Sequence, residues 1–139
     1  MVSFTLFKSV SLMAFAASLV SAAPANNKCS GFHVTAPHSY FTTTAGQCYQ
    51  VSFDFGGTKP AHPASVSVDL YESKTNKFVR NVADEVSGDS IATPWFNVDV
   101  GKKTGDYYFL VTYGDSCKPI KTPAFHVVYN KNSPPSVCL

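Results

Sequence analysis

The stretch 104-TGDYYFLVTYGDSC-117 decides the fold of this chain. Apolar side chains alternate along it, and a Gly-Asp pair lies near each end. Successive side chains of a β-strand point to opposite faces, so this alternation predicts a strand between two turns. Its first inward residue is a candidate tyrosine corner. We expect the buried face of this strand to carry Tyr107, Phe109, Val111 and Tyr113. The outer face is expected to carry Tyr108, Leu110 and Thr112.

Six further segments show the same two-residue period, with Gly, Pro, Asn and Asp between them. Seven short strands with one apolar face each require two sheets packed face to face. The sequence therefore predicts an all-β fold, an immunoglobulin-like seven-stranded antiparallel β-sandwich with two disulfides. Loops are expected over Gly56–Pro63 and Val86–Thr93, and the fourth strand is expected to be a weak edge strand. The six segments are 31–37, 48–55, 65–72, 78–83, 94–100 and 124–129.

The inward positions of these strands predict the core. The fourth segment shows no clear inward set. The expected core residues are Phe32, Val34, Ala36, Tyr49, Val51, Phe53, Phe55, Val66, Val68, Leu70, Phe96, Val98, Val100, Phe125, Val127 and Tyr129.

An even number of cysteines in an oxidising compartment indicates disulfides, and this chain has four. If successive strands run antiparallel, Cys29 and Cys117 lie at one end of the sandwich, and Cys48 and Cys138 lie at the other. This favours the pairs Cys29–Cys117 and Cys48–Cys138. A Cys48–Cys117 bridge of the immunoglobulin type would span a strand of roughly 20 Å, although bridged Cα atoms lie within about 7 Å.

The N-terminal segment 1–22 reads as a secretory signal peptide. Lys8 precedes an apolar run of about a dozen residues, too short to span a bilayer, and the small residues up to Ala22 suit a cleavage site. We therefore expect a single domain over 23–139, secreted as a monomer without a membrane anchor. Of the 11 basic residues, Lys8 lies in the signal, so ten remain against nine acidic ones. This balance excludes the basic footprint of a nucleic-acid-binding protein.

The order of several weak motifs resembles a known module. Pro37 is followed by AGQCYQVSF, SVSVDLY, PWFNVDV, TGDYYFLVTY and TPAFHVV, within residues 32–129. This order is similar to the N-terminal Ig-like domain of the fungal Kre9/Knh1 cell-wall family. The resemblance implies a fungal extracellular protein, without catalysis, that acts in glucan assembly or at the wall surface.

Catalytic chemistry is not indicated by the residues. The chain has two glutamates, and the strand aspartates are expected to point outward. A glycosidase needs two carboxylates that face one cleft, and neither a Gly-x-Ser-x-Gly elbow nor a free cysteine is expected. We predict that the protein is not an enzyme and needs no cofactor.

His33 and His126 are expected on the outer faces of the first and last strands, which often lie side by side in such sandwiches. Imidazole suits copper and zinc, but two histidines without a third ligand make a weak site. We predict exposed surface histidines and no metal.

Aromatic residues on the outer faces are the candidate binding residues. Tyr71 and Tyr108 are expected on strands that share a sheet, so their rings could be neighbours. Trp95 is expected on the other sheet. Exposed aromatic rings can bind the apolar face of a sugar or a protein partner.

Three functions follow from these features. The first is a secreted, non-catalytic protein that acts in or on the fungal cell wall, with cell-wall polysaccharide as its partner. The second is a secreted effector that binds an extracellular protein of a host or microbe. The third is a lipid carrier of the ML type, which is also a secreted β-sandwich. The aromatic inner faces look able to fill the interior, which disfavours the carrier.

Overall fold

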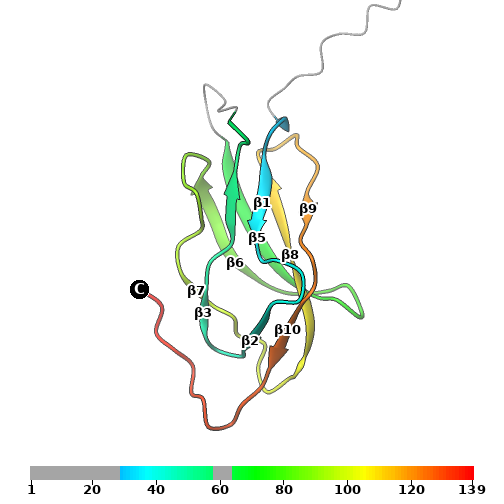
Figure 1. Ribbon diagram of the computed structural model, residues 1–139, viewed down its shortest axis with the longest axis vertical. Helices are drawn as coiled ribbons and strands as arrows, with labels where there is room; N and C mark the ends of the chain where they lie inside the picture. The colour runs from blue at the N-terminus through cyan, green and yellow to red at the C-terminus, as the bar shows by residue number, and fades with distance from the viewer. Residues whose placement is uncertain (1–28, 58–63) are drawn as a thin grey trace, which may run out of the picture.

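The structure, a computed structural model, describes residues 29–57 and 64–139. The predicted signal peptide and most of the loop before β5 lie outside the described residues. The strands of the described part, shown in Figure 1, are β1 (His33–Ala36), β2 (Thr42–Thr44), β3 (Cys48–Tyr49), β4 (Ser52–Asp54), β5 (Ser65–Glu72), β6 (Lys77–Ser87), β7 (Phe96–Asn97), β8 (Gly105–Tyr113), β9 (Ile120–Lys121) and β10 (Phe125–Val128).

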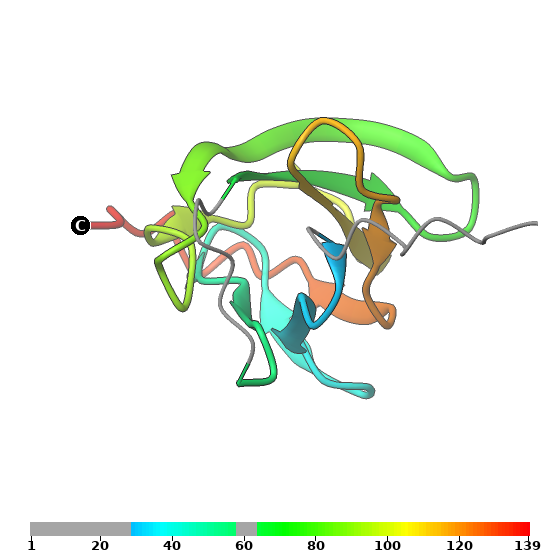
Figure 2. The ribbon, with the colours of Figure 1, turned by 90° about the horizontal axis from the view of Figure 1, so that it is seen from above.

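Two layers of strands form a β-sandwich, as predicted. The larger sheet has the order β2-β10-β8-β5-β6, with β9 paired to β8 beside β10. The pairs β1-β4 and β3-β7 make up the other layer, and a bridge between Ser52 and Ala92 extends it. Figure 2, a view from above, shows β5 and β6 on one side and β1 on the other. The stretch 104–117 contains β8, which lies in the middle of the larger sheet.

Three predicted details of the strands are wrong. The segment 48–55 is split into β3 and β4, and β2 is an additional strand that pairs with β10 in parallel, so the sheet is not purely antiparallel. A second additional strand, β9, precedes the predicted last strand, which forms β10, and Pro123, which has no N–H to give to the ladder, interrupts the pairing between the two. Thr122 bridges this interruption: its N–H donates to the Phe109 carbonyl, and its Oγ1 accepts from the Phe109 N–H, both at 2.9 Å.

Strand β6 is longer than the weak strand expected over 78–83. It has 11 residues and reaches Ser87, so the loop predicted to begin at Val86 begins later. It is an edge strand, as predicted, and pairs with β5. Its register against β5 shifts three times, and Glu85 has a positive φ of 50°. Such bulges remove the strict two-residue period, which is why the sequence pattern was weak here, and they make an edge less suited to pairing with another strand.

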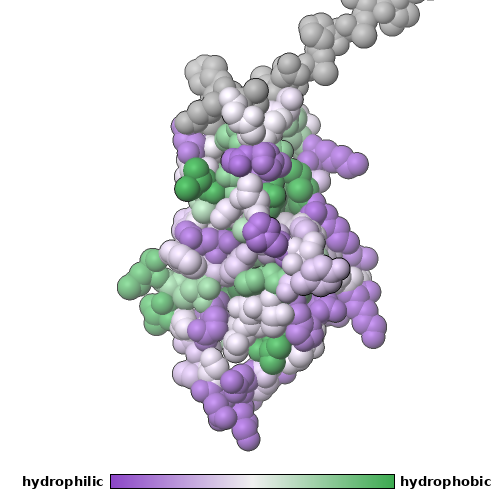
Figure 3. Space-filling model, in the orientation of Figure 1, coloured by the Kyte–Doolittle hydropathy of each residue, from purple (hydrophilic) through white to green (hydrophobic). Residues whose placement is uncertain are grey.

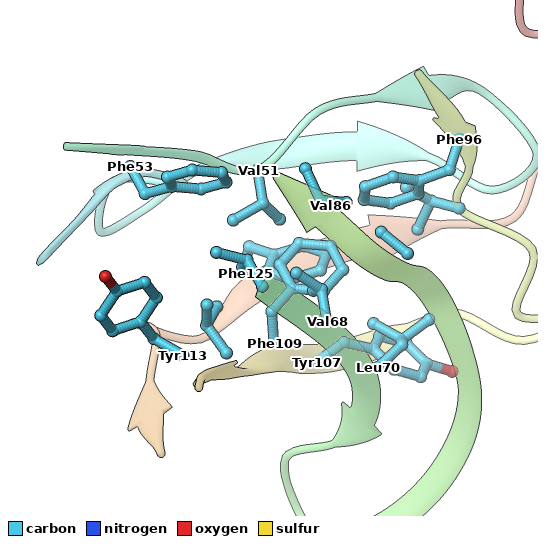
Figure 4. Packing of buried hydrophobic residues seen from close by; sticks show 14 of the residues in the cluster. Val51, Phe53, Val68, Leu70, Val86, Phe96, Tyr107, Phe109, Tyr113 and Phe125 are labelled. Atoms are coloured by element: carbon cyan, nitrogen blue, oxygen red, sulfur yellow. The ribbon is translucent and has the colours of Figure 1, made fainter. Parts of the chain in front are cut away.

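The core lies between the two layers and is rich in aromatic rings. Phe109 of β8 is fully buried, and its ring centroid lies 4.8 Å from that of Phe125 and 5.6 Å from that of Phe96. Figure 4 shows Val51, Phe53 and Phe96 of one layer facing Phe109, Phe125 and Val68 of the other. The rings therefore occupy the space between the sheets in this part of the molecule.

Most predicted core residues are buried or pack against the core, but two expectations fail. Tyr129 lies just after the end of β10 and is 37% exposed. Ala36 is half-buried at the end of β1, outside the core cluster. The candidate corner tyrosine, Tyr107, is buried, but the inward tyrosine of β8 that bonds to backbone is Tyr113, whose hydroxyl accepts from the Ala64 N–H at 3.4 Å.

The two disulfides join the cysteines that strand direction had predicted. Cys29–Cys117 has a Cα–Cα distance of 5.5 Å, and Cys48–Cys138 has one of 5.6 Å. The sequence separations are 88 and 90 residues. The second bridge fixes the segment after β10, where the Ser136 N–H also donates to the Gly46 carbonyl at 2.8 Å.

Candidate functional site

A row of three aromatic rings lies on the outer face of the larger sheet, across β8, β5 and β6. Tyr108 of β8 is directly opposite Tyr71 of β5, and Tyr71 is directly opposite Phe78 of β6. The rings of Tyr71 and Tyr108 are stacked at 5.4 Å between centroids, and those of Tyr71 and Phe78 meet edge to face at 5.7 Å. We call Tyr71, Phe78 and Tyr108 the ring row. The expectation that Tyr71 and Tyr108 share a sheet as neighbours is correct.

Tyr108 is not the exposed ring that was expected. It is only 6% exposed although it points away from the core. Tyr71 covers its ring by stacking, and the Lys121 ammonium lies 4.1 Å from its centroid. Its hydroxyl donates to Asn76 Oδ1 at 3.1 Å, in the turn between β5 and β6. Each of these contacts contributes about 1 kcal/mol to the stability of the fold. Tyr108 therefore holds the neighbouring Tyr71 ring in place and is not itself an accessible ring.

The rings that remain accessible are Tyr71, which is half-buried, and Phe78, which is 51% exposed. Phe78 was not a candidate from the sequence, because a single aromatic at the start of an irregular strand carries no signal. Its hairpin pairing with Tyr71, across the turn 73–76, is what places it in the row.

Trp95 is half-exposed and comes just before β7. β7 belongs to the layer opposite the ring row, so Trp95 does not extend the row, as expected. Figure 3 shows the side on which β1 lies in Figure 1, and there hydrophobic side chains form small separate groups among hydrophilic ones.

The two candidate histidines do not lie together. His33 is on β1, which pairs with β4, and His126 is on β10, which pairs with β2 and β8, so the expected adjacency of the first and last strands is wrong. Each histidine instead contacts one aspartate: His33 Nε2 lies 2.8 Å from Asp54 Oδ1, and His126 Nδ1 lies 2.7 Å from Asp106 Oδ1. Both histidines are on the surface, as predicted.

Within residues 29–57 and 64–139, no group of three or more His, Cys, Asp or Glu side chains is close enough to hold a metal ion. Over the same ranges, no helix is long and apolar enough to cross a membrane.

Comparison with known proteins finds similar folds only. No protein-family model and no curated protein sequence matches the chain. Among solved structures, the fibronectin(III)-like modules of Clostridium thermocellum CbhA are 16% identical, with a TM-score of 0.39; the match covers 70% of this chain and 93% of that one. Extracellular domains 3–5 of Drosophila OTK are 9% identical, with a TM-score of 0.44; that match covers 71% of this chain and 36% of that one. Similarity this distant supports no further conclusion. The strand order by itself is that of an immunoglobulin-like or fibronectin-like sandwich.

Proposed function

We propose that this chain is a secreted, non-catalytic binding module that attaches to polysaccharide of the fungal cell wall through the ring row. The observation that carries the proposal is the row itself: a half-buried tyrosine and a half-exposed phenylalanine, held on a rigid sheet face by a buried tyrosine. An aromatic ring offers an apolar surface at low entropic cost, which suits the C–H face of a pyranose.

Two further features are in keeping with this proposal, and the second of them disfavours the lipid carrier. Two disulfides are typical of extracellular proteins. The interior around Phe109 is filled by the rings of Phe96, Phe125 and Tyr49, whereas a lipid carrier needs a cavity between its sheets. The filled interior favours binding at the surface.

The proposal is tested by retention on insoluble β-glucan and on insoluble chitin. Wild-type protein should sediment with at least one of the two polymers. The double variant Tyr71→Ala/Phe78→Ala should stay in the supernatant, because it loses both accessible rings of the row. Trp95→Ala is the matched control, since it removes a half-exposed ring from the other layer.

Equal retention of the double variant and the wild type would show that the ring row is not the binding surface. Failure of the wild type to bind either polymer would exclude direct polysaccharide binding. In that case, capture of an extracellular protein that the double variant fails to capture would favour the effector function.

A further inference from the structure

A groove lies beside the ring row on the larger sheet. It has a volume of about 560 Å³ and is lined by the segment 39–42 before and at the start of β2, by the segment 123–126 at the start of β10, and by Asp106 of β8, which lies on the other side of β10 from β2. Asp106 and Tyr108 are two residues apart on β8, so they share the outer face at a spacing of about 7 Å. The groove and the ring row are therefore neighbouring parts of one surface.

Two hydrogen-bond acceptors border this groove. The Nδ1–H of His126 donates to Asp106 Oδ1 at 2.7 Å. In the neutral imidazole this leaves Nε2 as an acceptor, and the carboxylate keeps its second oxygen as another. The side chains of His126 and Asp106 are 44% and 63% exposed. A ligand at this position must therefore donate two hydrogen bonds from neighbouring groups.

The other histidine–aspartate pair, His33 and Asp54, leaves no ring nitrogen free to accept a hydrogen bond from a ligand. His33 contacts Asp54 through Nε2, and its Nδ1 lies 3.0 Å from the Gly31 carbonyl oxygen. Both ring nitrogens of His33 are thus used within the protein, whereas the described part of the chain gives His126 Nε2 no partner. The two pairs differ in what they leave free, which makes His33 a matched control.

Tyr40 belongs to the wall of the groove and is 97% exposed. Its backbone has a φ of 66°, a conformation that a bulky residue rarely adopts and that costs of the order of 1–3 kcal/mol. A ring so exposed gains almost no contacts within the chain to offset this cost. A strained and exposed aromatic residue beside polar acceptors is typical of a binding site.

We propose that this groove is a carbohydrate subsite that takes one neutral pyranose residue. Two adjacent sugar hydroxyls donate to His126 Nε2 and to the free oxygen of Asp106, while the Tyr40 ring covers the apolar face of the sugar. The inference rests on the proposed function and refines it: the polymer chain runs from this groove onto the ring row. A neutral sugar is favoured because the Asp106 carboxylate repels an acidic one.

The test uses the full secreted chain, labelled with ¹⁵N, and two soluble probes: a hexasaccharide of β-1,3-linked glucose and a hexasaccharide of β-1,4-linked N-acetylglucosamine. One of them should shift the amide signals of Tyr40, Ala124 and His126. Tyr40→Ala and His126→Ala should each weaken the affinity about tenfold, the loss of one good contact. His33→Ala should leave it within about twofold. A fully methylated probe, with a methyl group on every hydroxyl oxygen and on every acetamido nitrogen, cannot donate hydrogen bonds and should not bind.

Shifts confined to the surroundings of Tyr71 and Phe78 would overturn the groove and leave the proposed function standing. Tight binding of the methylated probe, or equal loss in the His33 and His126 variants, would also overturn it. If the wild type binds neither hexasaccharide but is still retained on an insoluble polymer, the groove is wrong while the ring row remains. If the wild type binds no hexasaccharide and is also not retained on an insoluble polymer, both proposals fail.

Discussion

Two neighbouring tyrosines of β8 are both buried, but for different reasons. Tyr107 is 2% exposed because it points into the space between the two layers, where side chains from distant strands surround it. Tyr108 is 6% exposed because single side chains from β5, β9 and the 73–76 turn lie over it on a face that has no second sheet above it. Burial of the first kind depends on the whole fold, whereas burial of the second kind depends on three contacts.

The largest expected effect is the loss of stability when each of these two tyrosines is replaced by alanine, and it should differ between the two kinds of burial. Tyr107→Ala should lower the free energy of unfolding by about 3–5 kcal/mol, because it opens a cavity in the core. Tyr108→Ala should lower it by about 1–3 kcal/mol, the sum of stacking, cation–π and hydrogen-bond contacts that water partly replaces. Urea denaturation of both variants measures the difference. Equal losses would show that the outer-face cluster is packed as tightly as the core.

The pH dependence of stability sharpens the comparison. Burial, and secondarily the nearby Glu72 carboxylate, raises the pKa of the Tyr107 hydroxyl above its usual 10.0. Burial also raises the pKa of Tyr49. Because the folded state keeps these protons to a higher pH than the unfolded chain does, their stabilisation is complete below pH 10 and is lost as pH rises through the folded pKa.

Tyr107→Phe should therefore reduce the fall in the free energy of unfolding as pH rises above 10, relative to pH 8. Chemical denaturation at a series of pH values measures this slope, with Tyr49→Phe as a second variant that should act in the same direction. An unchanged slope in both variants would show that neither tyrosine contributes to alkaline unfolding.

The smallest expected effect concerns Tyr40, which lies in the turn before β2 and is not buried at all. Tyr40→Gly should raise the free energy of unfolding by about 0.5–1 kcal/mol, because glycine accepts a φ of 66° without strain. The same variant should lose sugar binding. Thermal unfolding and probe titration of one preparation measure both quantities. A variant that is less stable than the wild type would show that the ring contributes contacts to the fold.

The inner faces of the strands could be predicted from local pattern, because alternation in a half-buried strand is imposed by the core on one side. Phe109, Val111 and Tyr113 follow it without exception. The prediction failed where bulges break the period, as in β6, and it missed β9, which has only two residues and so shows no period. It also missed β2, whose three threonines show no alternation of apolar and polar side chains.

The candidate site could be predicted only in part. Alternation placed Tyr71 and Tyr108 outward, and the order of strands placed them in one sheet. The exposure of Tyr108 could not be predicted, because its covering residues Lys121 and Asn76 come from other segments. Phe78 and the groove at Tyr40 were missed for the same reason: each depends on which strands pair and in what register.

The sequence alone determined the two faces of each regular strand and, through the direction of successive strands, which cysteines could meet. Both follow from the two-residue period of an extended chain, which is a local property. Only the tertiary structure decided which outward residues are accessible and which histidine nitrogen has no partner among residues 29–57 and 64–139. These depend on contacts between residues far apart in the chain, such as Tyr108 with Lys121 and Asp106 with His126, and no local period encodes them.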